Sequence, residues 1–384
     1  MSSATTTTCS SQNSSTDTLS ADADMEAVDC SERIEVKAET RPDFNKLKAI
    51  EKTRRDTLFR AELPFWWILT YNSGSCLRDI ANDVMVWATL AIYIGIRTHA
   101  RVIADVPEFV EMLLKTNVDI LGGFLSFFLV LFVNQTNSRF LDMYGFSKAC
   151  AGRVQDICHL AKAQLPYEAA DQLVRHFNAA QIAGYTGMNA VGRGSPYSKI
   201  HFFDHYNNKH SLLTREEMSE LCRHDMNHSA LCMKELCTWC QMDVARARKD
   251  GHIDSNQEML MHEKILDFRA AMDGMYDYTD QPPHFFYIHF LALLSAIYLP
   301  LFAIDTACQG IWEEEFSIGL DILQGIIVFL QCIFVVGLRS LGTKMIDPYG
   351  ADLTDLSVIH YVEASLEICG TIMRANQPTE ATQP

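Results

Sequence analysis

"FFYIHFLALLSAIYLPLFAI", residues 285–304, is an apolar run that contains no Asp, Glu, Lys or Arg. An α-helix rises about 1.5 Å per residue, so this run is long enough to cross a hydrocarbon core of about 30 Å. A second uncharged run, "ILQGIIVFLQCIFVVGL" (322–338), is nearly as long. Together they predict membrane-spanning helices and place the chain among helical membrane proteins.

Two shorter apolar runs lie nearer the N-terminus, "MVWATLAIYIGI" (85–96) and "ILGGFLSFFLVLFV" (120–133). Neither is long enough to span a membrane alone. Flanking polar residues complete both spans if the helices face a protein interior or a water-filled pore; the alternative is a buried helix in a soluble core. We expect four spans, at about 76–97, 118–135, 284–304 and 316–338.

The distribution of Lys and Arg predicts the orientation in the membrane. The loop "DTACQGIWEEE" (305–315) has none, whereas the segment before the first span carries Lys46, Lys48, Lys52, Arg54, Arg55 and Arg60. Arg339 and Lys344 follow the last span. Because basic residues favour the cytoplasmic side, we expect both termini and the helical region 139–283 to be cytoplasmic. We expect an integral protein of the plasma membrane rather than of an organelle.

The formal net charge of −16 comes partly from an acidic, Ser/Thr-rich beginning. This composition predicts a disordered tail over residues 1–45. A folded region over 46–372 and a short tail over 373–384 follow. Among the twelve cysteines only Cys308 falls on the expected outer side, so no outer disulfide is expected.

The region between the two pairs of spans has helical periodicity and little strand-like alternation. In "TREE" (214–217), the Thr214 side chain can accept from the backbone N–H of Glu217, and the Glu217 side chain can accept from that of Thr214. This reciprocal pair at a helix start is a capping box. The chain is therefore expected to be all-helical.

One cysteine and histidine pattern suggests zinc. Three of its members recur every four residues and would share a helix face, and two form a "CTWC" pair: His224, His228, Cys232, Cys237 and Cys240. The alternative is a helix with buried thiols and ordinary polar histidines. No GxSxG, Walker or HExxH motif is present, so an enzyme is not expected, and neither is a nucleic-acid partner.

The second expected span has phenylalanines at helical spacing after Gly122 and Gly123. These rings would be core in a packed bundle. If the helix lines a conduit, they would form an apolar constriction that gates by wetting and dewetting.

Beyond the last span, "DPYGADLTDL" (347–356) places Asp347, Asp352 and Asp355 on a turn. The carboxylates either lie in solvent where the helix ends or bind a cation. Calcium prefers six to eight oxygen ligands, which carboxylates and carbonyls on a flexible turn can supply.

Six motifs in order resemble the bestrophin family of anion channels. They are "GSCLRD" (74–79), "NQTNSRF" (134–140), "LLTREEMSEL" (212–221), "RARKDGHI" (246–253) with Trp239, "YDYTDQP" (276–282) and "IDPYGADLTDL" (346–356). The resemblance covers most of residues 70–365. It implies a homopentamer around a central pore, with four membrane helices and long cytoplasmic helices in each subunit.

The resemblance also implies an apolar neck on the second helix at Gly123, Phe127 and Leu131. Family necks favour bulky residues at all three positions, so Gly123 implies a wider or shorter constriction, or a one-residue shift to Phe124. Asn134 and Arg139 would lie at the cytoplasmic end of the pore. The implied function is conduction of chloride, and also of bicarbonate, by electrodiffusion.

In animal bestrophins the corresponding acidic turn forms a calcium clasp. By resemblance, Asp352 and Asp355 would contribute side chains, and Asp347 and Lys344 backbone carbonyls, so that calcium opens the channel. Ala351, Leu353 and Thr354 depart from the family by replacing acids. Two other classes stay open: a non-conducting four-span scaffold in membrane lipid, whose cytoplasmic helices bind partners, and a membrane-anchored metalloprotein using the His and Cys pattern.

Overall fold

The computed structural model describes residues 43–58, 64, 75–103, 118–188, 196–227, 230–309, 318–350 and 352–376. Within these ranges every regular element is helical, which confirms the all-helical prediction. Residues 1–42 and 377–384 lie outside the described part, and so does most of each expected tail. The first described helix, α2 (Phe44–Leu58), begins at the expected end of the N-terminal tail.

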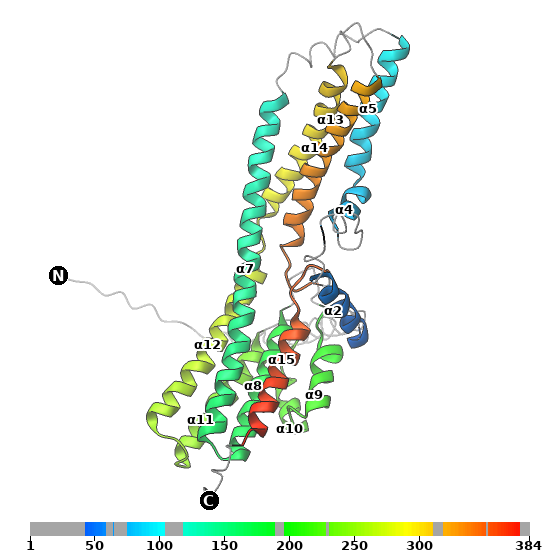
Figure 1. Cartoon of the computed structure of the whole chain (residues 1–384). Coiled ribbons are helices and arrows are strands. Elements are labelled where there is room, and N and C mark those ends of the chain that lie inside the picture. Colours follow the sequence, from blue (N-terminus) through cyan, green and yellow to red (C-terminus); the bar gives the residue numbers. More distant parts are fainter. Residues whose placement is uncertain are drawn as a thin grey trace, which may run out of the picture.

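The molecule is elongated, with a membrane half and a polar half joined by one long helix (Figure 1). The membrane half contains α5 (Val84–Ile103), the first part of α7 (Val118–Gln164), α13 (Phe285–Cys308) and α14 (Ile318–Lys344). Buried apolar side chains hold these helices together, among them Leu125, Leu129, Phe132, Leu299 and Val335.

Three of the described helices are long and apolar enough to cross a membrane: α7, α13 and α14. The first expected span is instead two helices, α4 (Cys76–Asn82) and α5, with a bend of 64° between them. Asp83 lies at the bend in an extended conformation, and its carboxylate accepts a hydrogen bond from Met85 N at 2.8 Å. Asp83 thereby ends α4 and caps α5, so the pair makes a fourth span only if it crosses as one broken helix.

Helix α7 is a single helix of 47 residues rather than a span followed by a separate helix. At about 1.5 Å per residue it is about 70 Å long, more than twice the thickness of a hydrocarbon core. No proline interrupts it, and it ends at Gln164 just before Pro166. One rigid element therefore connects the two halves.

The polar half has four further long helices: α8 (Tyr167–Gly187), α11 (Leu231–Lys249), α12 (Ser255–Asp280) and α15 (Val358–Arg374). Helices α8, α12 and α15 pack against the second part of α7, and α11 packs against α8 and α12. Its core includes Phe177, Tyr185 and Phe268, all fully buried. Three short elements complete this half: the π-helical turn η2 (Lys199–Phe203), α9 (Asp204–His210) and α10 (Arg215–Leu221). The capping box predicted at Thr214 and Glu217 is confirmed at the start of α10.

Candidate functional site

One side of α7 in the membrane half is apolar yet faces away from the rest of the chain. The exposed fractions are 58% for Phe124, 59% for Phe127 and 44% for Leu131. Gly123 lies on the same side, with no atom within 4 Å of a Cβ built there. The residues expected at the neck thus share one open face of the helix; their role in a pore remains a prediction.

The opposite side of α7 packs closely against α13, so α7 cannot be rotated about its own axis without a clash. A Cβ at Gly122 would lie 2.7 Å from the Tyr298 hydroxyl, so α13 approaches the backbone of α7 there. Leu125 and Leu129 are fully buried on this side. Of the two adjacent glycines, Gly122 permits helix packing and Gly123 leaves the open face without a side chain.

At the end of the open face, Asn134 is exposed but Arg139 is not free. The Arg139 guanidinium donates to the Gln281 carbonyl at 2.8 Å and lies 4.9 Å from the centre of the Tyr278 ring. These residues line a cleft of about 690 Å³ beside the connection between α12 and α13. Arg139 therefore joins α7 to that connection.

The acidic turn between α14 and α15 is anchored on α7 by Tyr349. Its hydroxyl donates to the Met143 carbonyl at 2.8 Å and lies 2.5 Å from Ser147 Oγ. Leu356 N donates to the Pro348 carbonyl at 2.7 Å, which closes the turn. The turn is a built structure rather than a loose helix exit.

Arg54 of α2 holds the other side of the turn, a contact that no sequence signal indicated. Its Nη2 donates to the Asp352 carbonyl at 2.7 Å, and its Nη1 donates to the Leu356 carbonyl at 3.0 Å. Nη1 also lies 3.4 Å from Oε2 of Glu51, which is itself buried. About 300 residues separate Arg54 from the carbonyls that it binds, so only folding brings them together.

Asp355 is the buried carboxylate of the turn, with 6% of its surface exposed. Its Oδ2 accepts from Asp352 N at 2.7 Å, while its Oδ1 has no hydrogen-bond partner among the described residues. Burial raises the pKa of Asp355 to about 7, with repulsion from Asp352 and Asp347 adding to the rise and the hydrogen bond from Asp352 N and the charge of Arg54 opposing it. The orphaned oxygen is a position that a cation could satisfy.

The other residues expected at the clasp are arranged less like a metal cage. Asp352 has an exposed side chain, and Lys344 directs its Nζ to Asp79 Oδ2 at 2.5 Å. In the described part of the chain, no three His, Cys, Asp or Glu side chains converge closely enough to hold a metal. Any cation at the turn would therefore depend on backbone carbonyls as well as on carboxylates.

The helix face expected for the zinc pattern is not formed. His224 lies in a turn before α11, His228 lies outside the described residues, and α11 begins only at Leu231, so His224 and Cys232 do not share a helix. Burial raises the pKa of the Cys237 thiol to about 12 and that of the Cys240 thiol well above its ordinary value. Both thiols pack as core residues of the polar half.

The fold and these features define an integral, all-helical membrane protein in which a membrane bundle continues into a polar helical half. A family model described as "Bestrophin, RFP-TM, chloride channel" matches residues 58–375, so the chain belongs to the bestrophin family. The family description names a channel and no enzyme. No curated protein matches the chain.

Solved structures show the same fold. A bacterial bestrophin homologue from Klebsiella pneumoniae superposes with a TM-score of 0.61 at 14% identity, covering 76% of this chain and 98% of the homologue. A variant of that homologue gives 0.62 at 13% identity over the same shares, as does a crystal structure described as a membrane protein. At this identity the similarity establishes the fold alone.

Proposed function

We propose that this chain is the subunit of a homopentameric anion channel that conducts chloride, and also bicarbonate, across the plasma membrane. Each subunit would cross the membrane four times, with both termini and the polar half in the cytoplasm. Transport would be electrodiffusion through a pore lined by α7.

The observation that carries this proposal is the open face of α7 in a chain of the bestrophin family. Gly123, Phe124, Phe127 and Leu131 form an uncharged row that no other described part of the chain covers. Five such rows around an axis would make an apolar constriction, which passes ions only when it is wetted. The positive edges of aromatic rings would favour anions as they lose part of their hydration.

We further propose that calcium opens the channel by binding at the acidic turn. The carboxylates of Asp352 and Asp355, with the carbonyls of Lys344 and Asp347, would hold the ion. The support is the buried, orphaned Oδ1 of Asp355, since an oxygen in that state is stabilised by a cation. Arg54 donates to the backbone carbonyls of Asp352 and Leu356, and neither carbonyl is among the four ligand groups proposed for calcium.

The test is the reversal potential of the purified protein in planar bilayers under a chloride gradient, with free calcium stepped from chelated to micromolar. A potential near the chloride value that appears only with calcium would support both proposals. A chloride current indifferent to calcium would keep the channel and refute the calcium site. No current from folded, pentameric protein would refute the channel in favour of a scaffold.

A further inference from the structure

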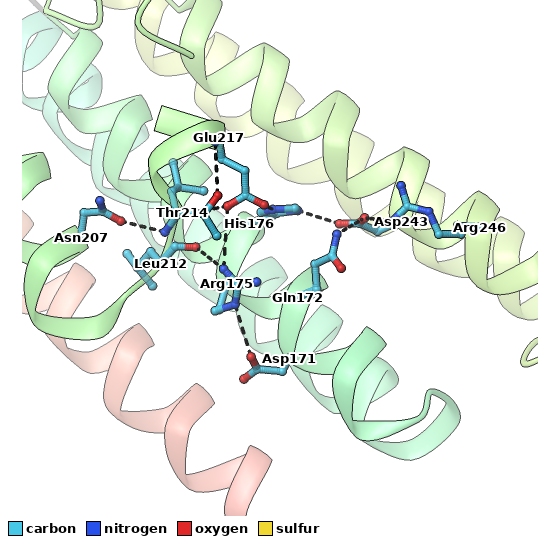
Figure 2. Close-up of polar contacts among 11 residues, drawn as sticks. Asp171, Gln172, Arg175, His176, Asn207, Leu212, Thr214, Glu217, Asp243 and Arg246 are labelled. Atoms are coloured by element: carbon cyan, nitrogen blue, oxygen red, sulfur yellow. Dashed lines mark hydrogen bonds and ion pairs between the residues drawn. The ribbon is translucent and has the colours of Figure 1, made fainter. Parts of the chain in front are cut away.

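A buried histidine in the polar half is held between two carboxylates from different helices. His176 of α8 is 3% exposed. Its Nδ1 lies 2.7 Å from Asp243 Oδ2 on α11, and its Nε2 lies 2.9 Å from Glu217 Oε1 on α10 (Figure 2). One imidazole thus joins three helices.

In each of these two carboxylates, the oxygen that does not face His176 accepts hydrogen bonds from other groups, which orient the carboxylate. Asp243 Oδ1 accepts from Gln172 Nε2 at 2.9 Å and from Arg246 Nη1 at 3.2 Å. Glu217 Oε2 accepts from Thr214 N at 2.8 Å, which is half of the capping box of α10. In each case the remaining oxygen is directed at the imidazole, so both ring nitrogens face an acceptor.

Only the charged form of His176 satisfies this arrangement. A neutral imidazole has one N–H donor and one lone pair, whereas the imidazolium has two donors. Burial by itself lowers the pKa of His176, but the hydrogen bonds and charges of Asp243 and Glu217 outweigh it, and the net pKa is raised above its ordinary value.

Charged side chains surround His176 on α8, α10 and α11. Glu217 faces the ring from α10, and Glu216 and Glu220 lie beside it in the same shallow pocket. Asp243 and Arg246 face it from α11. On α8 itself, Arg175 pairs with Asp171 at 3.3 Å and lies 4.0 Å from Glu217. Arg246 shares Asp243 with the imidazole, and Arg175 pairs more closely with Asp171 than with Glu217. A proton on His176 therefore supplies the positive charge that lies between Asp243 and Glu217.

We propose that protonated His176 holds α8 against α10 and α11, and that this contact weakens as the pH rises.

The direction follows from linkage between proton binding and folding. A histidine whose pKa is higher in the folded than in the unfolded protein stabilises the folded state. This stabilisation is complete at a pH below the unfolded pKa, about 6.5, and it is lost as the pH rises through the folded pKa. Glu217 sets the acid limit, because burial raises its pKa but the hydrogen bonds from Thr214 and His176 and the nearby positive charges give a net lowering. Its contribution is therefore lost only in acid, as pH falls through that lowered value.

The decisive variant is Glu217→Gln. Its amide oxygen can still accept from Thr214 N, since Gln also serves in a capping box. Its amide N–H₂ would then face His176 Nε2 and donate to it, so the site would suit the neutral imidazole. The exposed His159 of α7 provides the matched control, His159→Gln.

The experiment measures the thermal midpoint of the full-length protein in detergent from about pH 6 to about pH 9. The wild type and His159→Gln should lose stability in parallel as the pH rises. In Glu217→Gln that loss should disappear or move down by about one pH unit or more, because a neighbouring negative charge is removed. Equal pH profiles for Glu217→Gln and the wild type would overturn the proposal.

A second measurement needs no variant. Amide hydrogen exchange of α10 in the wild type, corrected for the intrinsic effect of pH, should show protection that falls as the pH rises. Protection that is constant across the range would also overturn the proposal. Both readouts are independent of ion conduction, so they separate this inference from the proposed channel function.

Discussion

At the scale of single residues, Arg54 is a buried cation that joins two parts of the chain about 300 residues apart. Its guanidinium presents a rigid fork of donors that matches two carbonyls of the acidic turn. It is 3% exposed, so its hydrogen bonds are made out of contact with water. The N-terminal helix α2 is therefore attached to the turn that follows the last membrane helix.

Arg54→Gln should destabilise the protein by about 3 kcal/mol, because it removes the donors from two buried carbonyls and the positive charge beside the buried Glu51 carboxylate. The thermal midpoint in detergent is the measurement. The matched control is Lys52→Gln on the exposed side of the same helix, expected to change stability by less than about 0.5 kcal/mol. Equal effects of the two variants would contradict this role of Arg54.

Phe127→Ala should increase the single-channel chloride conductance, because it removes an aromatic ring from the proposed constriction. Ile322→Ala on α14 is the control, since Ile322 is 60% exposed and Phe127 is 59% exposed. A conductance unchanged in Phe127→Ala, or changed equally in both variants, would place the constriction elsewhere.

At the scale of elements, the helices of the membrane half are positioned by close contacts as well as by apolar area. The end of α14 is tied to α4 and the bend after it: Arg339 pairs with Asp83, and Ser340 Oγ donates to Asp79 Oδ2 at 2.9 Å. Near the same end, Gly342 lies against the ring of Phe132 on α7, where an added Cβ would clash. The contacts that position the end of α14 therefore also hold α4 and the bend at Asp83.

Gly342→Ala should cost about 1–3 kcal/mol, because the fully packed Phe132 ring cannot move aside without strain. Gly337 is on the same helix with open space around it, so Gly337→Ala should cost little or nothing. Thermal midpoints of the two variants check this prediction. A loss in Gly337→Ala as large as that in Gly342→Ala would show that the close contact does not decide stability.

At the scale of the whole molecule, the continuity of α7 joins the membrane half to the polar half without a flexible hinge. Helix α8, which carries His176, packs against the second part of α7, the helix that also carries Phe127. The same helix presents an apolar row with no cover in the described chain, and large uncovered apolar surfaces mark sites of association with protein or lipid.

The proposed assembly predicts a particle of five chains of 43.4 kDa each in mild detergent. Light scattering with correction for bound detergent measures the protein mass. A monomeric or dimeric mass for folded protein would contradict the central pore.

The sequence by itself determined the helical class, the long uncharged runs around 285–304 and 322–338, and the capping box at Thr214 and Glu217. These features depend on residues within a few turns of one another, so their patterns are readable along the chain. The order of short motifs was also sufficient to indicate the family.

Only the tertiary structure decided that α7 is one helix, that a bend at Asp83 separates α4 from α5, and which side of α7 is open. It alone brought Arg54 to the acidic turn and placed His176 between Glu217 and Asp243, which are 41 and 67 residues away. The physical reason is that the sequence shows whether a side chain is apolar or charged, whereas the packing of helices distant in sequence determines which group that side chain contacts. Burial then determines what that partnership does to the stability and protonation of each group.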